Sequence, residues 1–273
     1  MKIIVPMAGL GTRFQKVADQ NPEYTKPKPL ISVRGFPMVR WATGSLPFLE
    51  HPGQHVVSPL RVTPKDMIFI VLKEHDKSHA ITSELKKIYS NDIHVISLDA
   101  VTRGAAETAY QTRPFVDPDE QIIISDSDHF FDGSYLAAML EHKDPDTAGM
   151  IPVFSAPDDR IPRWSYALVK SGSTVIEQVG EKDRALMERG AYANIGAYCF
   201  TKAHYFFDAV EEAIAANRTT GDEGKKEFYV APIYQELISK GMKIQAAITP
   251  IVWGLGTPAD LEYFLQHCDT KLP

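Results

Sequence analysis

The chain has 273 residues, of which 29 are Lys or Arg and 35 are Asp or Glu, so its formal net charge is −6. This acidic balance argues against a nucleic-acid partner, and no apolar run approaches the roughly 18 residues that would indicate a membrane-spanning helix. The two cysteines, Cys199 and Cys268, form no zinc or redox motif and are typical of a cytoplasmic protein.

Short β-branched apolar runs alternate with helical patterns through the first half of the chain. The patterns predict strands at residues 2–7, 67–72, 92–98 and 121–125, and helices at residues 37–49, 76–89, 104–113 and 134–141. Strand–helix alternation of this kind indicates an α/β protein with a mostly parallel central sheet and helices on both faces, which is a Rossmann-like three-layer α/β/α fold.

The second half has more strands and fewer helices. The patterns predict strands at residues 149–154, 166–170, 174–179, 194–200 and 243–249, helices at residues 204–216 and 228–239, and a last helix that begins at Thr257. Successive strands without intervening helices favour an antiparallel or mixed portion of the sheet. Residues 47–64 contain four prolines and two histidines without a clear period, so we expect an irregular loop there.

The most informative segment follows the first strand. The small residues within positions 8–12 allow backbone N–H groups to approach an anion closely. Arg13 adds a planar charge that suits phosphate oxygens. Phe14 stands where a dinucleotide-binding fingerprint needs its third glycine, and the lysine of a Walker A loop is absent. Lys28 follows 15 residues after Arg13, between two prolines that stiffen its position. The residues of this candidate phosphate loop before Arg13 are Ala8, Gly9, Leu10, Gly11 and Thr12.

The segments GLGTR (9–13) and PKPLISV (27–33) resemble the nucleotidyltransferase family that includes the sugar-1-phosphate nucleotidylyltransferases, or NDP-sugar pyrophosphorylases. The resemblance covers nearly the whole chain and implies a single domain, 1–273, with a GT-A-like nucleotidyltransferase fold. It implies an NTP-binding half at 1–145 and an acceptor-binding half at 146–273. It also implies that the loop wraps a triphosphate, that Arg13 faces the leaving pyrophosphate, and that Lys28 meets the α-phosphate or the incoming phosphate.

Two further segments match the nucleotide side of this family. The stretch TRGAAET (102–108) corresponds to a turn that opens a helix beside the nucleotide, and the stretch IIISDSD (122–128) corresponds to a strand that ends in a metal-binding aspartate. Magnesium prefers hard oxygen ligands, so the resemblance implies an Mg²⁺ site with Asp128 as the first choice and Asp126 as the second. The nucleotide-binding residues implied by the first stretch are Arg103, Gly104, Glu107 and Thr108.

The acceptor side resembles the family less completely. The residues implied to bind the acceptor are Glu181, Lys182, Asn194 and Lys226. Relatives often carry a second metal aspartate two positions before a Gly-Thr pair near the C-terminus, whereas this chain has Gly254 at that position. The metal site is therefore expected to depend on one protein carboxylate, or to recruit Asp126 or Glu181.

The sequence thus predicts an Mg²⁺-dependent nucleotidyltransferase that joins an NMP from an NTP to a phosphorylated small molecule, with a sugar 1-phosphate as the first choice. Catalysis would consist of positioning and charge neutralisation, because the acceptor is already an anion. Two alternatives stay open: a glycosyltransferase that uses Asp126-Ser127-Asp128 as a DxD motif, and a nucleotide-binding regulatory protein without turnover. The base, the acceptor and the oligomeric state, a homo-oligomer included, also stay open.

Overall fold

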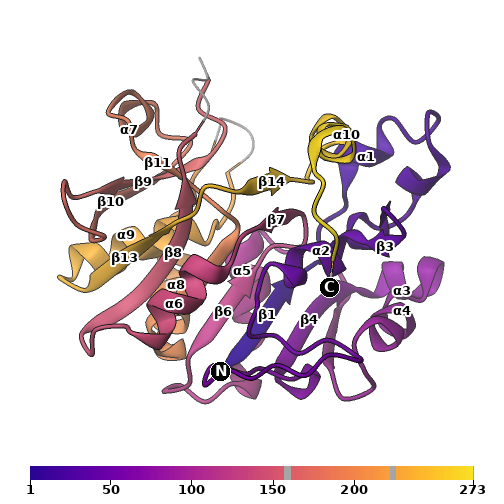
Figure 1. Ribbon diagram of the computed structural model, residues 1–273, viewed down its shortest axis with the longest axis horizontal. Helices are drawn as coiled ribbons and strands as arrows, with labels where there is room; N and C mark the ends of the chain where they lie inside the picture. The colour runs from indigo at the N-terminus through magenta and orange to yellow at the C-terminus, as the bar shows by residue number, and fades with distance from the viewer. Residues whose placement is uncertain (157–160, 222–225, 273) are drawn as a thin grey trace.

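The computed structural model describes residues 1–156, 161–221 and 226–272. Within these residues one large sheet holds ten strands (Figure 1). They are β1 (Lys2–Pro6), β4 (Met67–Leu72), β5 (His94–Leu98), β6 (Ile122–Ser125), β8 (Thr147–Phe154), β9 (Ser165–Val169), β10 (Ile176–Glu181), β11 (Tyr192–Asn194), β12 (Ala197–Phe200) and β13 (Lys243–Ile248). Their order across the sheet is β10-β9-β11-β8-β12-β6-β1-β4-β5, with β13 beside β8.

The sheet is mixed, as the sequence predicts. Strands β6, β1, β4 and β5 run parallel, and Ile4 of β1 lies in register between Ile68 and Ile124. Strand β12 is antiparallel to both β6 and β8, and β11, β9 and β10 continue the antiparallel portion. The pairing of β6 with β12 joins residues 1–145 and residues 146–273 in one sheet. The binding of the NTP by the first of these halves and of the acceptor by the second stays a prediction.

Helices cover both faces of the sheet, which confirms the three layers. Ile4 faces the apolar cluster that contains α5, α8 and α9, whereas Ile3 and Val5 face the cluster that contains α2, α4 and α6. No helix of the described residues is long and apolar enough to cross a bilayer. The helices are α1 (Thr12–Gln15), α2 (Met38–Gly44), α3 (Lys73–His79), α4 (Ile81–Ile88), α5 (Ala105–Tyr110), α6 (Ser134–Glu141), α7 (Arg184–Glu188), α8 (Ala203–Ala215), α9 (Ala231–Ser239) and α10 (Pro258–His267).

Three predicted elements differ most from the sequence patterns. The helix predicted at 76–89 is divided at Ala80, which has a φ of 48°, and the Asp76 carboxylate accepts the backbone N–H of Thr82 at 2.8 Å at the start of α4. The strand predicted at 194–200 is divided into β11 and β12, because Gly196 turns its carbonyl toward the N–H of Asp126 at 2.6 Å. The helix predicted at 37–49 ends at Gly44.

Two short two-stranded sheets lie outside the main sheet and were not predicted. One pairs β2 (Ser32–Val33) with β3 (Phe36–Pro37), and the other pairs β7 (His129–Phe131) with β14 (Val252–Gly254). The second pair brings a late segment of the chain to the end of β6, where the candidate site lies. The loop at 47–64 is irregular, as expected, apart from a bridge between Leu49 and Val62 and a short 3₁₀ turn that begins at Pro64.

Candidate active site

The loop after β1 forms one wall of a cavity. The strand ends where the N–H of Met7 donates to the carbonyl of Ile70, and Gly11 then adopts a φ of 67°, which a side chain would strain. Helix α1 begins directly afterwards, and its Phe14 is buried in an apolar cluster that also contains residues of α10. This anchor holds the glycine loop in place and leaves Arg13 exposed at the rim of the cavity.

Lys28 enters the cavity from a short 3₁₀ turn, Lys28–Leu30. Pro29 and Leu30 are buried, so the turn cannot swing freely and the lysine is presented in a defined direction. Its ammonium nitrogen lies 2.7 Å from Oδ2 of Asp128, and the two side chains are 28% and 22% exposed. The lysine that the sequence singles out is thus paired with the predicted metal ligand.

Asp126 and Asp128 follow β6, which runs parallel to its neighbour β1, so the loops after both strands lie at the same edge of the sheet. The pKa of Asp126 is raised to about 7, because its carboxyl group is buried away from water and lies near the negative charges of Asp128 and Glu181. Burial also opposes ionisation of Asp128, but the charge and hydrogen bond of Lys28 outweigh it and hold the pKa of Asp128 below its usual value. Asp128 is therefore the ionised carboxylate of the pair at neutral pH.

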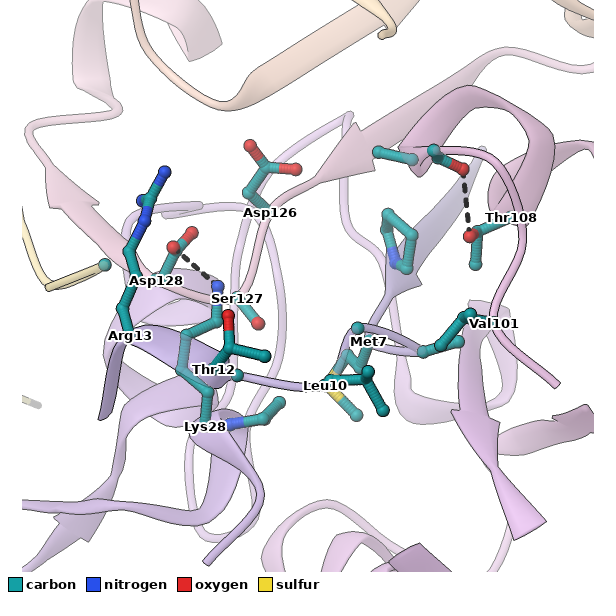
Figure 2. A pocket seen from close by; sticks show the side chains of 18 of the residues that line it. Met7, Leu10, Thr12, Arg13, Lys28, Val101, Thr108, Asp126, Ser127 and Asp128 are labelled. Carbon is teal, nitrogen blue, oxygen red and sulfur yellow. Dashed lines mark hydrogen bonds and ion pairs between the residues drawn. The ribbon is translucent and has the colours of Figure 1, made fainter. Parts of the chain in front are cut away.

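These elements enclose a cavity of about 460 Å³. Figure 2 shows Arg13, Lys28 and Asp128 grouped on one side of it, and Leu10 and Val101 on the other. The structure brings eleven predicted residues to its lining: Ala8, Gly9, Leu10, Gly11, Thr12, Arg13, Lys28, Gly104, Thr108, Asp126 and Asp128. Lining residues to which the sequence analysis assigned no individual role include Met7, Val101, Thr102, Ala105, Ser127, Glu227 and Gly256.

Gly104 brings a distant segment to the cavity. Its φ is 146°, and a Cβ added there would lie 2.5 Å from the carbonyl oxygen of Phe228. The N–H of Phe228 donates to the carbonyl of Arg103, and the N–H of Ala106 donates to the carbonyl of Phe228. These bonds fix Glu227, which neighbours Phe228, beside the start of α5. The sequence analysis named Lys226 of this segment, but the part of the chain that the segment contacts could not be read from the sequence.

Arg103 and Glu107 do not line the cavity. Nη2 of Arg103 donates to Glu107 at 2.5 Å, the Arg103 N–H donates to the same carboxylate at 2.6 Å, and the guanidinium lies 4.7 Å from the centre of the Phe228 ring. Together they brace the turn that carries Gly104. Their assignment to nucleotide binding stays a prediction.

The four predicted acceptor residues also lie outside the cavity lining. Glu181 accepts the hydroxyl of Ser165 and is close enough to Asp126 to help raise its pKa. Lys182 adopts a φ of 50°, and Asn194 is buried with no hydrogen-bond partner for its side-chain amide within the described structure. Lys226 is exposed.

The C-terminal glycines occupy different positions relative to the aspartates. Gly254 pairs with His129 across the β7–β14 sheet, and a Cβ there would approach Asp260 at 3.6 Å. Gly256 lines the cavity, and a Cβ there would lie 2.5 Å from Oδ2 of Asp128. Within the described residues, no group of three His, Cys, Asp or Glu side chains is arranged around a common metal position.

This donor set suits magnesium better than a metal that needs a complete protein cage. Magnesium usually takes one or two carboxylates and completes its shell with water and substrate phosphate oxygens. Asp128 and Asp126 supply those carboxylates beside a loop whose composition suits phosphate, so the residues present fit the ion.

Comparison with known proteins identifies a family model that covers most of the chain. The model of the nucleotidyl transferase family matches residues 25–258, a region that includes Lys28 and Asp128 but begins after the glycine loop. Among curated proteins no significant match was found.

Several solved structures share the fold. The chain is similar to a nucleoside-diphosphate-sugar pyrophosphorylase from Vibrio cholerae RC9, with 24% identity, a TM-score of 0.74 and coverage of 97% of this chain and 100% of that chain. It is also similar to the UTP-bound UGPase from Acinetobacter baumannii, with 16% identity, a TM-score of 0.68 and coverage of 97% and 92%. The inositol-1-phosphate CTP transferase from T. maritima gives 15% identity, a TM-score of 0.64 and coverage of 99% and 98%.

Proposed function

Because the chain belongs to the nucleotidyl transferase family, we propose that it transfers an NMP group from an NTP to a phosphorylated small molecule and releases pyrophosphate, with Mg²⁺ bound at Asp128. The observation that carries this proposal is the 2.7 Å pair of Lys28 and Asp128 in one cavity with the glycine loop. Nucleotidyl transfer requires a cation and a metal ligand beside a loop that can bind the phosphates of the NTP, and this cavity contains all three.

The reaction needs no protein nucleophile. An oxygen of the acceptor phosphate attacks the α-phosphorus of the NTP, the bond to the β-phosphate oxygen breaks, and pyrophosphate leaves. Backbone N–H groups of residues 8–12 and the Arg13 guanidinium hold the leaving pyrophosphate. Lys28 neutralises charge between the attacking and leaving groups, which stabilises the transition state electrostatically.

Magnesium, when bound, would neutralise phosphate charge and orient the reacting oxygens. Asp128 would hold it, because this carboxylate is ionised at neutral pH and already lies beside the Lys28 ammonium. Asp126 would assist, since its pKa of about 7 leaves part of the population ionised and a nearby cation would increase that part.

The acceptor would lie next to the aspartates, against Glu181, Lys182 and Asn194. The left-handed conformation of Lys182, with a φ of 50°, is costly for a residue with a side chain and is commonly found at functional positions. Asn194 is 5% exposed with both side-chain polar atoms unpaired within the described structure, so it has hydrogen-bonding capacity that an acceptor hydroxyl could fill. Two structural neighbours, a nucleoside-diphosphate-sugar pyrophosphorylase and an inositol-1-phosphate CTP transferase, support a sugar 1-phosphate or a similar phosphorylated polyol as acceptor.

The test is release of pyrophosphate by the purified protein in Mg²⁺, measured with each NTP and a panel of sugar and polyol phosphates. Turnover with one pair supports the proposal. NTP binding without pyrophosphate release from any pair would favour a regulatory protein. Binding of nucleotide sugars but not NTPs would favour the glycosyltransferase that the Asp126-Ser127-Asp128 motif left open.

A further inference from the structure

The cavity has a second end that the phosphate chemistry does not use. Figure 2 shows Leu10, Val101 and Thr108 on the side away from Arg13 and Asp128. Leu10 is 45% exposed and Val101 is 49% exposed, so two apolar side chains lie open to the cavity instead of being packed. Such surfaces suit the flat apolar faces of a nucleobase, whose edge would then meet the polar groups nearby.

Two of those polar groups are the hydroxyls of Thr102 and Thr108. They lie 2.6 Å apart, and they lie 3.0 Å and 3.1 Å from the carbonyl oxygen of Gly104. Each hydroxyl has one hydrogen. Whichever hydroxyl donates to the other, the second donates to Gly104, so both hydrogens are used within the protein. The pair can offer a ligand only acceptor lone pairs.

The third polar side chain at this end is Glu227, which is held beside the start of α5 by the backbone bonds of Phe228 and by two backbone bonds to Thr220. An ionised carboxylate accepts hydrogen bonds and donates none. It has about four lone-pair positions, so it can keep an existing partner and still accept from a ligand. The side chains lining this end of the cavity in the described residues therefore carry acceptors without a free donor.

We propose that these side-chain acceptors, with Glu227 as their charged member, select nucleoside triphosphates whose base carries an exocyclic amino group and disfavour UTP and dTTP. Cytosine, adenine and guanine present exocyclic N–H₂ donors. Uracil and thymine present a single ring N–H donor flanked on both sides by carbonyl oxygens, and where cytosine has its amino group they place a carbonyl oxygen that faces the carboxylate unfavourably. The inference rests on the proposed function and names the class of nucleotide that the site takes.

The experiment compares nucleotides with the same ring system in which the amino group is replaced by a carbonyl or by hydrogen, which separates this effect from base size. Dissociation constants are measured by calorimetry in Mg²⁺ for CTP against UTP, and for ATP and GTP against ITP, with dTTP included. The tightest amino-bearing NTP should bind at least about tenfold more tightly than its partner without that group, which corresponds to about 1.4 kcal/mol. A smaller ratio, or UTP or dTTP as the tightest ligand, would overturn the proposal.

Glu227→Gln tests the role of Glu227 itself. The glutamine side chain has nearly the same shape, but its N–H₂ group can donate a hydrogen bond to a carbonyl oxygen of the base. The amino preference should fall at least about fivefold in this variant. Glu177→Gln, an exposed carboxylate on β10, is the matched control and should keep the wild-type ratio. An unchanged ratio of dissociation constants in Glu227→Gln would show that Glu227 does not select the base. The comparison of nucleotides with the wild-type protein tests base selection even if this variant does not fold.

The outcomes also separate this inference from the function beneath it. Equal binding of all the NTPs, with pyrophosphate release intact, would overturn base selection and leave the nucleotidyltransferase proposal standing. Absence of binding by every NTP would overturn both.

Discussion

The ammonium nitrogen of Lys28 lies 2.7 Å from a carboxylate oxygen of Asp128, although 100 positions separate the two residues in the chain. The pair holds the carboxylate ionised and holds the lysine side chain in the cavity before any substrate arrives. Both groups are partly exposed, so the pair contributes little to the free energy of unfolding. Its role is to hold the ammonium and the carboxylate in position for the reaction.

Replacement of Lys28 tests whether this cation acts in the reaction. Lys28→Ala should lower the rate of pyrophosphate release by about 10²–10³-fold, because a charge that stabilises the transition state is lost. Lys26→Ala is the control, since Lys26 lies in the same TKPKPL segment but pairs with Glu23 at 2.6 Å instead of entering the cavity. A Lys28→Ala rate equal to that of Lys26→Ala would contradict the mechanism.

The two aspartates should respond differently to neutralisation. Asp128→Asn should abolish the Mg²⁺ dependence together with nearly all turnover, whereas Asp126→Asn should raise the Mg²⁺ concentration for half-maximal rate and leave measurable activity. The reason is that Asp128 is ionised at neutral pH, while the pKa of Asp126 lies near 7. Titration of each variant with MgCl₂ provides the measurement, and the reverse order of effects would assign the metal to Asp126.

Gly256 and Gly254 form a matched pair of alanine substitutions. The new Cβ of Gly256→Ala would lie 2.5 Å from Oδ2 of Asp128 and would displace that carboxylate from Lys28. Turnover should fall at least about tenfold, because small misplacement of a reacting group is costly. In Gly254→Ala the nearest atoms, those of Asp260, lie at 3.6 Å, so activity should stay near that of the wild type. Equal rates for the two variants, at equal melting temperature, would argue against the placement of Asp128.

His51 predicts a pH dependence of stability outside the site. It is 4% exposed, lies beside Tyr89, and burial together with the charge of Arg40 lowers its pKa to about 3. The unfolded chain binds a proton at this residue near pH 6.5 and the folded protein does not, so the stabilising contribution is complete above pH 6.5 and is lost as the pH falls toward 3.

The free energy of unfolding should therefore decrease on acidification by up to about 1.4 kcal/mol per pH unit from this residue alone. Urea unfolding between pH 6.5 and 4.5 measures it, and His51→Leu should show the shallower slope. His55→Leu, at a side chain that is 75% exposed in the same loop, is the control and should keep the wild-type slope. Identical slopes for wild type and His51→Leu would show that His51 does not titrate in this way.

Local patterns predicted most of the regular structure, because they depend on neighbouring residues. The all-apolar strand Met67–Leu72 and the helix Ser134–Glu141 match their predicted bounds. Failures occurred where a distant contact overrides local preference. The Asp76 side chain starts a second helix after Ala80, and the carbonyl of Gly196, turned toward Asp126, divides a predicted strand.

The site shows the same division. The sequence by itself determined the glycine loop, the proline-flanked Lys28 and the aspartates after β6, because turn chemistry and strand ends are encoded in consecutive residues. Only the tertiary structure decided that Lys28 meets Asp128, that Glu227 lies beside Gly104, and that Arg103 pairs with Glu107 outside the cavity. Those outcomes depend on strand order and register, which place the loops after β1 and β6 at one edge, and no stretch of neighbouring residues specifies them.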